Sequence, residues 1–170
     1  MDKIIFATGN EGKMREIREI FKDAPYSVVS MKEAGITADI VEDGTTFEEN
    51  ALIKARAVAG VSGAVAMADD SGLEVDFLDK APGVYSARFL GEDTSYEIKN
   101  QYILDKLKDV PDERRTARFV CAIAVAFPDG RTAVRTAAIE GRIAYEPAGE
   151  NGFGYDPIFY VTEYGRTTAE

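Results

Sequence analysis

The stretch Ala64-Val-Ala-Met-Ala-Asp-Asp-Ser-Gly-Leu73 decides how this chain is interpreted. Its first five residues are small and apolar and a turn signal follows them, which predicts a short buried strand. Asp69 and Asp70 come at the expected end of this strand, and their carboxylates are predicted to diverge because successive strand side chains point to opposite faces. Ligands of α/β sheets bind beyond such strand ends, where a carboxylate suits Mg²⁺, water or both. The alternative is a plain turn, because Asp-Asp-Ser-Gly is common turn chemistry.

The composition is that of an ordinary globular protein with an acidic balance. The 170 residues are 45% hydrophobic and 29% charged, and the net charge of -10 disfavours duplex nucleic acid and anionic membranes as partners. There is no histidine, so acid–base chemistry must come from carboxylates, Lys, Tyr or metal-bound water. The single cysteine, Cys121, agrees with a reducing, cytoplasmic location. We predict one domain over 1–170, with neither a signal peptide nor a membrane-spanning run.

A phosphate-binding layout is predicted near the start of the chain. An apolar strand over 3–8 leads into the loop Thr8-Gly-Asn-Glu-Gly-Lys13, and a helix with one apolar face is expected from Met14 onward. The N–H groups and the dipole at a helix start favour an anion, and Lys13 adds a full charge. The spacing is not that of a P-loop. The alternative is an ordinary strand-to-helix turn with a solvated lysine.

A second candidate segment joins an acidic loop to a helix. Thr46 and Glu49 have the spacing of a capping box, which predicts that a helix starts here. Asn50 and Lys54 are four residues apart and therefore share one face of this helix. Glu42 precedes the helix, where its side chain can reach a site. Taken singly, Glu42 is better explained as a solvated loop acid, and Lys54 as an exposed helix lysine.

Two loops in the second half of the chain have the composition of binding loops. The first, over 82–89, carries one cation, Arg88. The second, over 149–157, combines glycines with Phe153, Tyr155 and Asp156, which suits a pocket that stacks a flat base and hydrogen-bonds its edge. The alternative is a turn whose aromatic side chains belong to the core. Around these loops the patterns predict a strand over 26–31, a helix over 94–107, an antiparallel hairpin over 114–127 and 132–143, and a strand over 158–161.

Five segments in a fixed order resemble one protein family. They are Thr8–Lys13, Glu42 with Thr46–Asn50 and Lys54, Ala68–Leu73, Pro82–Phe89 and Gly152–Pro157. In this order they are similar to the inosine triphosphate pyrophosphatases, also called the Ham1 family, and to the bacterial dITP/XTP branch. The resemblance covers nearly the whole chain. It implies an elongated, two-lobed α/β fold around a mixed sheet, with flanking helices and a central cleft.

The resemblance also implies an activity and assigns roles to residues. The family hydrolyses ITP, dITP and XTP to the monophosphate and pyrophosphate with Mg²⁺, as a homodimer. Carried over to this sequence, Glu42 and Asp70 bind Mg²⁺, and Asp70 is the catalytic proton acceptor with Asp69 in support. The substrate contacts that the resemblance implies are Thr8, Gly9, Asn10, Glu11, Gly12, Lys13, Lys54, Ser71, Arg88, Phe153, Gly154, Tyr155 and Asp156.

One part of the family pattern has no counterpart in this sequence. The family continues beyond the segment that matches Gly165–Glu170 into a Ser-His-Arg motif that helps to recognise the purine and the phosphates. We therefore expect a domain shortened at its C-terminus. A non-catalytic nucleotide-binding module is the alternative to a hydrolase.

Overall fold

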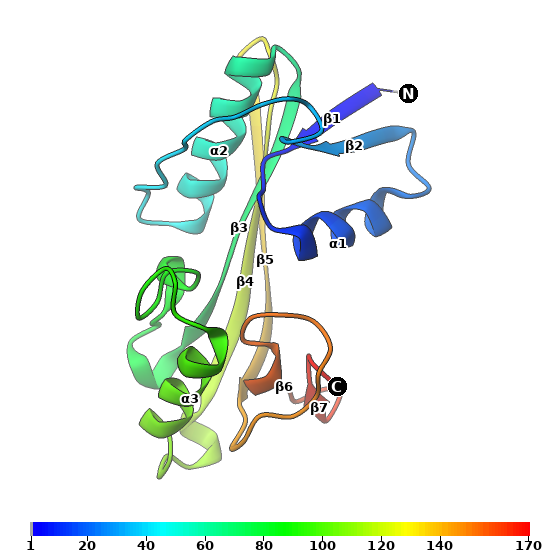
Figure 1. Ribbon diagram of the computed structural model, residues 1–170. Coiled ribbons are helices and arrows are strands. Elements are labelled where there is room, and N and C mark those ends of the chain that lie inside the picture. The colour runs from blue at the N-terminus through cyan, green and yellow to red at the C-terminus, as the bar shows by residue number, and fades with distance from the viewer. Residues whose placement is uncertain (1) are drawn as a thin grey trace. The chain divides into compact units, whose positions relative to one another are not determined.

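The computed structural model describes residues 2–170, which form a seven-stranded sheet and three α-helices (Figure 1). The sheet order is β2-β1-β3-β4-β5-β6-β7. β1 pairs in parallel with β2 and β3, whereas β6 is antiparallel to β5 and β7, so the sheet is mixed. The predicted α/β class with a mixed sheet and flanking helices is confirmed. The elements are β1 (Asp2–Phe6), α1 (Glu11–Phe21), β2 (Tyr26–Ser30), α2 (Phe47–Ser62), β3 (Val65–Val75), α3 (Tyr96–Lys106), β4 (Thr116–Ala126), β5 (Thr132–Ile143), β6 (Phe159–Val161) and β7 (Arg166–Thr167).

The described residues divide into two compact units. Unit 1 comprises the chain up to Asp70 together with Cys121–Thr136, and unit 2 comprises Ser71–Val120 and Ala137–Glu170. The strands β3, β4 and β5 contribute residues to both units. Between residues 2 and 170, no helix combines the length and the apolar character that crossing a bilayer requires.

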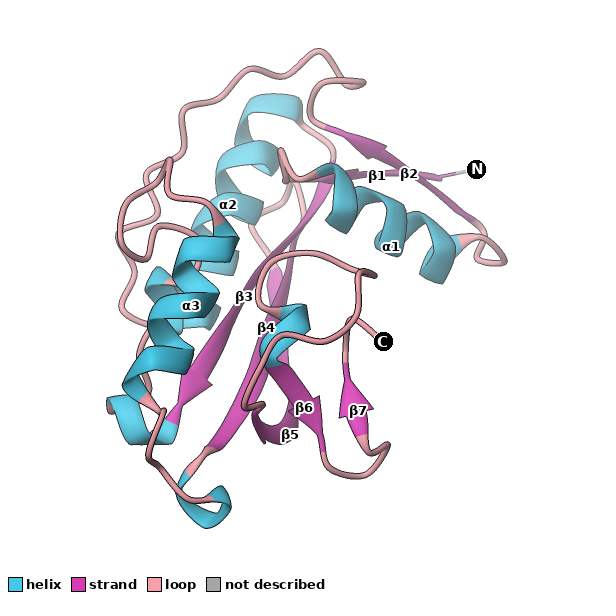
Figure 2. Cartoon of the chain, turned by 60° about the horizontal axis from the view of Figure 1, so that its bottom comes forward, coloured by secondary structure: helices cyan, strands magenta, loops and turns pink. Residues whose placement is uncertain are grey.

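Unit 1 has helices on both faces of its sheet. Met14 and Ile17 of α1 pack with Phe6 of β1 and Met67 of β3 in one core cluster. On α2, Ala51, Ala55 and Val58 are fully buried. α1 and α2 lie on opposite sides of the strands, which is the usual way to cover a parallel sheet (Figures 1 and 2).

The starts of α1 and α2 are both fixed by side-chain caps. The Thr46 side chain accepts a hydrogen bond from the N–H of Glu49 at 3.1 Å, as the predicted capping box requires. Asn10 caps α1 by accepting from the N–H of Lys13 at 3.1 Å. The prediction that the helix begins only at Met14 is therefore wrong: 11–13 form its first turn, because Asn10 is a strong N-cap residue.

β3 continues through the residues at which the sequence predicts a turn. The turn expected at Asp69-Asp70-Ser71-Gly72 does not form, and the strand runs unbroken from Val65 to Val75. Both carboxylates have partners on packed helices, and Leu73 and Val75 are fully buried further along. Tertiary contacts therefore override the local turn preference of this sequence. Asp69 and Asp70 lie in the middle of a strand and not at its end.

Unit 2 is built around α3 and a second core. Ile103, Leu104 and Leu107 pack with Leu73 of β3 and with the aromatic rings of the last third of the chain. Arg115 is 1% exposed and donates hydrogen bonds to the carbonyl oxygens of residues that follow α3 and β5, among them Val110 at 3.2 Å and Ala144 at 2.7 Å. This guanidinium satisfies backbone acceptors that would otherwise be buried without donors.

The C-terminal strands show where the sequence patterns succeed and fail. The predicted hairpin is confirmed, with β5 at 132–143 as predicted and a turn closed by the hydrogen bond from Phe127 N to Arg131 O at 2.9 Å. β7, which has two residues, was not predicted. A strand of this length is too short to show the alternation of apolar and polar residues that identifies strands.

Candidate functional site

The carboxylates of Asp69 and Asp70 point to different partners, as predicted. Asp69 Oδ2 lies 2.7 Å from Nζ of Lys13, which belongs to the first turn of α1. Asp70 Oδ2 accepts a hydrogen bond at 3.2 Å from Nδ2 of Asn50 on α2. Both acids are buried, with 5% and 9% exposure. One carboxylate therefore holds a lysine beside the first loop, and the other faces the helix that follows the acidic loop.

Lys13 stays cationic although it is largely buried. Burial acts to lower the pKa of its ammonium group, but the charge of Asp69 and the hydrogen bond to it act the other way, and Asp70 adds to them. The net result is a pKa above the ordinary lysine value. Lys13 therefore carries a positive charge at neutral pH.

Asp70 has the opposite kind of environment. Burial raises the pKa of its carboxyl group to about 6, which the charge of Lys54 and the hydrogen bond from Asn50 only partly offset, and Glu42 raises it further. An aspartate pKa this high indicates a negative charge that the folded protein does not fully neutralise. Such carboxylates are typical of sites that bind a cation or exchange a proton.

The acidic loop is tied to α2 beside Asp70. Glu42 Oε1 lies 2.9 Å from Nζ of Lys54, and the Asn50 side chain accepts from the N–H of Gly44 at 2.8 Å. A Cβ on Gly44 would lie 2.6 Å from Asn50 Oδ1, so only glycine allows the loop to come this close. Asn50 thus links the loop to Asp70, a role that the sequence analysis missed, although the four-residue spacing to Lys54 placed both on one face.

The first loop is pre-formed by its own polar side chains. Thr8 Oγ1 accepts from the N–H of Asn10 at 3.1 Å, and Asn10 in turn caps α1 at Lys13. A Cβ on Gly9 would meet nothing within 4 Å. The packing of the protein itself therefore does not require a glycine at this position. All of the predicted residues up to Asp70 belong to unit 1, where Asp69 contacts the first turn of α1 and Asp70 contacts α2.

The other predicted residues belong to unit 2, where the aromatic loop divides into an exposed and a buried part. Phe153 is 39% exposed, whereas Tyr155 is 3% exposed and its hydroxyl donates to Ser86 O at 2.6 Å. Tyr155 thus belongs to the core, as in the alternative interpretation of this loop, and Phe153 presents its ring to solvent. The guanidinium of Arg88 lies over the Tyr85 ring at 5.1 Å, and Ser71 is half-buried on β3.

Asp156 closes the aromatic loop on itself. Its Oδ2 accepts from the N–H of Phe153 at 2.9 Å, and its Oδ1 accepts from Thr168 Oγ1 at 2.9 Å. Gly152 has φ +71°, and a Cβ there would lie 2.1 Å from Asp156 Oδ2, so a side chain would break this closure. Each carboxylate oxygen has a second lone pair, so Asp156 retains acceptor capacity for a ligand.

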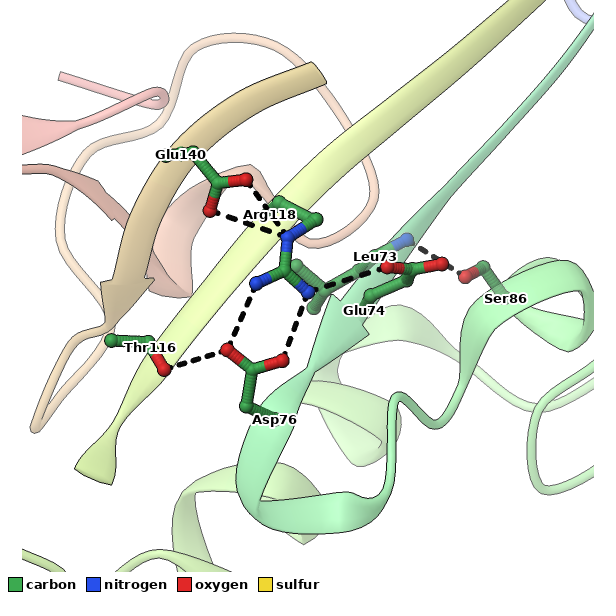
Figure 3. A network of polar contacts seen from close by, with 7 residues as sticks. All are labelled: Leu73, Glu74, Asp76, Ser86, Thr116, Arg118 and Glu140. Carbon is green, nitrogen blue, oxygen red and sulfur yellow. Dashed lines mark hydrogen bonds and ion pairs between the residues drawn. The ribbon is translucent and has the colours of Figure 1, made fainter. Parts of the chain in front are cut away.

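A second group of acids on and after β3 has a structural role in unit 2. Arg118 contacts Glu74 at 3.3 Å, both oxygens of Asp76 at 2.9 Å, and Glu140 at 2.9 Å (Figure 3). Thr116 Oγ1 donates a further hydrogen bond to Asp76 at 2.6 Å. Hydrogen bonds from Arg118 and Thr116 hold the pKa of Asp76 below its ordinary value. Arg118 thus donates hydrogen bonds to all three of these carboxylates and neutralises much of their charge, whereas the lysines of unit 1 leave the charge of Asp70 partly uncompensated.

Comparison with known proteins identifies the family. The sequence profile of the Ham1 family matches residues 4–170. The chain belongs to the Ham1 family. It is 51% identical over 168 residues to a dITP/XTP pyrophosphatase of Desulforamulus reducens, covering 99% of this chain and 84% of that protein. It is 48% identical over 170 residues to the dITP/XTP pyrophosphatase of Bacillus subtilis, covering 100% of this chain and 86% of that protein.

Solved Ham1 structures agree with this assignment. A HAM1 protein from Coxiella burnetii matches with a TM-score of 0.89 and 41% identity, over 99% of this chain and 86% of that chain. The Ham1 protein of Staphylococcus aureus matches with a TM-score of 0.87 and 43% identity, over 99% of this chain and 85% of that chain. The resemblance inferred from the five ordered segments is therefore confirmed.

Proposed function

We propose that this Ham1 protein hydrolyses the triphosphates of inosine, deoxyinosine and xanthosine to the monophosphate and pyrophosphate. Its similarity to several proteins named dITP/XTP pyrophosphatase supports this activity. The observation that carries the proposal is the combination in unit 1 of two cationic lysines, Lys13 and Lys54, with the buried Asp70, whose charge is incompletely neutralised.

The triphosphate is proposed to bind at the start of α1. It carries about four negative charges near neutral pH, which an acidic protein must neutralise locally. The N-terminal end of a helix and a lysine ammonium both favour a phosphate group, and Lys13 stands in the first turn of α1. The open space around Gly9 allows a phosphate to approach the backbone closely. Lys54 adds a second cation from α2.

The residues of unit 1 also fit Mg²⁺, which we propose as the cofactor. Glu42 and Asp70 would hold it, since Mg²⁺ is usually bound by one or two carboxylates together with phosphates and water molecules. No cluster of three or more His, Cys, Asp or Glu side chains that could hold a metal occurs within residues 2–170, so at most two side chains of these types would bind the ion. The high pKa of Asp70 fits a nearby cation, which would favour its ionised form. When bound, Mg²⁺ would offset the charge of the phosphates and of the leaving pyrophosphate.

We propose that Asp70 also accepts a proton during the reaction and that Asn50 and Asp69 assist. Asp70, in its ionised form, accepts a proton from the attacking water. The water oxygen bonds to phosphorus at the α–β anhydride, the anhydride bond breaks, and pyrophosphate leaves with its electron pair. Asn50 orients the Asp70 carboxylate through the 3.2 Å hydrogen bond. Asp69 contributes indirectly by holding Lys13 in place.

The aromatic loop of unit 2 is proposed to recognise the base. The exposed ring of Phe153 offers a stacking surface, and Asp156 follows it within the same loop. Hypoxanthine and xanthine carry a protonated ring nitrogen that a carboxylate can accept from, whereas adenine has no hydrogen on this nitrogen. A site built around one hydrogen bond discriminates against a base that lacks the donor. ITP and XTP should therefore be preferred to ATP.

Pyrophosphate release from ITP, dITP and XTP in the presence of Mg²⁺ tests this function. Release of pyrophosphate with the monophosphate is the expected result. Release of orthophosphate would place the cleavage at a different bond and contradict the proposal. Tight binding of ITP without turnover, measured by calorimetry on the same preparation, would instead favour the non-catalytic nucleotide-binding module.

Two properties of the intact protein are also proposed. We infer a homodimer from the family resemblance, and size-exclusion chromatography with light scattering tests it: a mass near twice 18.6 kDa is expected, and a monomer at all concentrations would contradict it. We infer a cytoplasmic location because the lone Cys121 cannot form an intrachain disulfide. Fractionation of cells that express the protein tests the second inference.

A further inference from the structure

We propose that Asn100, on α3, is a positioning residue for the base-recognition loop and thereby sets the affinity for the purine. The inference rests on the proposed function of this loop and extends it to a residue that the family motifs do not mark. Asn100 Nδ2 donates a hydrogen bond at 3.1 Å to the carbonyl oxygen of Gly154. Gly154 stands between the exposed Phe153 and the buried Tyr155. A hydrogen bond to its carbonyl therefore restrains the backbone next to Phe153 and, through it, the position of the Phe153 ring.

The hydrogen bond from Asn100 to Gly154 is one of three contacts that a single face of α3 makes in unit 2. The ring of Tyr96 meets Tyr155 edge-on at 5.2 Å between centroids. Lys99, which is 1% exposed, donates from Nζ to Ala87 O at 2.5 Å. Because Tyr96, Lys99 and Asn100 have the i, i+3, i+4 spacing of one helix face, α3 presents them together. A rigid helix therefore fixes both the loop around Ala87 and the aromatic loop.

The aromatic loop is also held by hydrogen bonds to residues 168 and 169. Thr168 Oγ1 donates to Asp156 Oδ1 at 2.9 Å, and the N–H of Asn151 donates to Ala169 O at 2.9 Å. Gly154 itself has φ +66°, and a Cβ there would lie 3.6 Å from the Tyr96 ring. The loop is thus fixed at both ends of Phe153-Gly154-Tyr155-Asp156, and Asn100 supplies the anchor from a helix.

The amide of Asn100 acts on the loop as a donor only. The residue is 6% exposed, and its buried Oδ1 has no hydrogen-bond partner among residues 2–170. Replacement by Asp keeps the shape of the side chain but sets an oxygen against the Gly154 carbonyl oxygen. A protonated Asp can still donate to this carbonyl, whereas an ionised Asp repels it. The N100D variant therefore separates the hydrogen bond from simple packing.

The test compares N100D with wild type in the KM and kcat for ITP and in the dissociation constant of ITP. At about pH 8.5 we expect KM and the dissociation constant to rise about tenfold, which is the scale for losing one buried hydrogen bond and gaining a repulsive contact, with kcat changed by less than about twofold. Burial raises the pKa of a carboxyl group, so the introduced Asp should become protonated as the pH falls toward about 6. The ratio of the variant's KM to that of wild type should then decrease. The titratable side chains nearby, Tyr96, Lys99, Tyr155 and Asp156, are common to both proteins, so they cancel in this ratio.

Gln101→Glu is the matched control, because it makes the same change from amide to acid one residue away on the exposed face of α3. It should behave like wild type at each pH. Thr168→Val removes the other anchor at an exposed position, where folding is not at risk, and should raise KM in the same direction by about threefold to tenfold.

The outcomes separate this inference from the proposed function. Turnover of ITP by wild type with unchanged KM and binding in N100D would overturn the positioning role and leave the function intact. Binding of ITP without turnover by wild type, weakened in N100D with the expected pH dependence, would overturn the hydrolase and support the positioning role. A rise in KM that is equal at all pH values would show that Asn100 acts through packing, which also contradicts the inference.

Discussion

Two aspartates, Asp70 within β3 and Asp76 directly after it, have carboxyl pKa values that are shifted in opposite directions. In unit 1, burial raises the pKa of Asp70 to about 6, and its contacts are an asparagine and lysines that only partly offset the burial. In unit 2, the pKa of Asp76 lies below its ordinary value, because Arg118 donates to both of its oxygens. The forked guanidinium saturates a carboxylate, whereas an amide and a more distant ammonium leave part of its charge uncompensated.

The difference separates a structural acid from a candidate functional one. A saturated carboxylate stabilises the fold and has little affinity left for an added cation. An under-neutralised, buried carboxylate destabilises the fold in the absence of its ligand, which is characteristic of catalytic and metal-binding groups.

The largest expected effect is on catalysis. Asp70→Asn keeps the side-chain size and removes the charge needed for proton acceptance and cation binding. Pyrophosphate release from ITP should fall about 10²-fold or more, the scale for loss of a positioned acid–base group. Asp76→Asn, the same change in the saturated group, should stay within about threefold of wild type. An equal loss of pyrophosphate release in both variants would show that Asp70 and Asp76 do not differ in function.

A third acid sharpens the contrast, because Asp156 has a partner on each oxygen, as Asp76 does, and is nevertheless proposed to recognise the base. Asp156→Ala should lower the preference for ITP over ATP about tenfold through loss of the acceptor. Phe153→Ala should weaken all purine triphosphates alike through lost stacking. Steady-state kinetics with ITP and ATP measure both effects.

Thr168→Val is the control for Asp156, because it removes one partner of the carboxylate and keeps the carboxylate itself. It should raise KM for ITP and ATP together. If it lowered the preference for ITP as much as Asp156→Ala does, the role of Asp156 would be to close the loop and not to recognise the base.

Smaller effects are expected on stability, and they should have opposite signs. The folded-state pKa of Asp70, about 6, exceeds the ordinary value of 3.8, so the folded protein binds the extra proton between these values. Stability is therefore lost as pH rises through this window, and the loss is complete above about pH 6. With a chelator present, Asp70→Asn should melt higher than wild type at about pH 8 by about 2–4 °C, with the gain fading as the pH falls toward 3.8.

Replacing Asp76 should change the melting temperature in the opposite direction from replacing Asp70. Because the folded-state pKa of Asp76 is lowered, its carboxylate contributes stability above the ordinary value, and this contribution is lost as the pH falls. Asp76→Asn should therefore lower the melting temperature at about pH 8 by about 2–4 °C, allowing for partial exposure of the network. A higher melting temperature in this variant would contradict the structural role of Arg118 and its acids.

Local patterns predicted much of this protein correctly. The Thr46 cap, the β4–β5 hairpin and the divergence of Asp69 from Asp70 all follow from short-range rules on caps, turns and strand alternation. These features depend on residues close together in the chain. The family assignment followed from the order of five short motifs and is confirmed by the comparisons.

Contacts between residues far apart in the sequence could not be predicted in the same way. The continuation of β3 through Ser71-Gly72 depends on packing that overrides a turn preference, and the link from Asn50 to Asp70 spans twenty residues of chain. The hydrogen bond from Asn100 to Gly154 spans 54 residues, and nothing in either local sequence indicates it. The assigned roles of the site residues and the single domain over 1–170 stay predictions.

The carboxyl pKa of Asp70 is the quantity that tests the central contrast most directly. It can be measured by NMR titration of protein labelled with ¹³C at the aspartate side-chain carboxyl carbon, in the presence of a chelator, with D70N and D76N to assign the two resonances. We predict that the Asp70 resonance titrates at about 6 and the Asp76 resonance below 3.8. An Asp70 resonance that titrated at or below 3.8 would show a neutralised carboxylate and contradict the account.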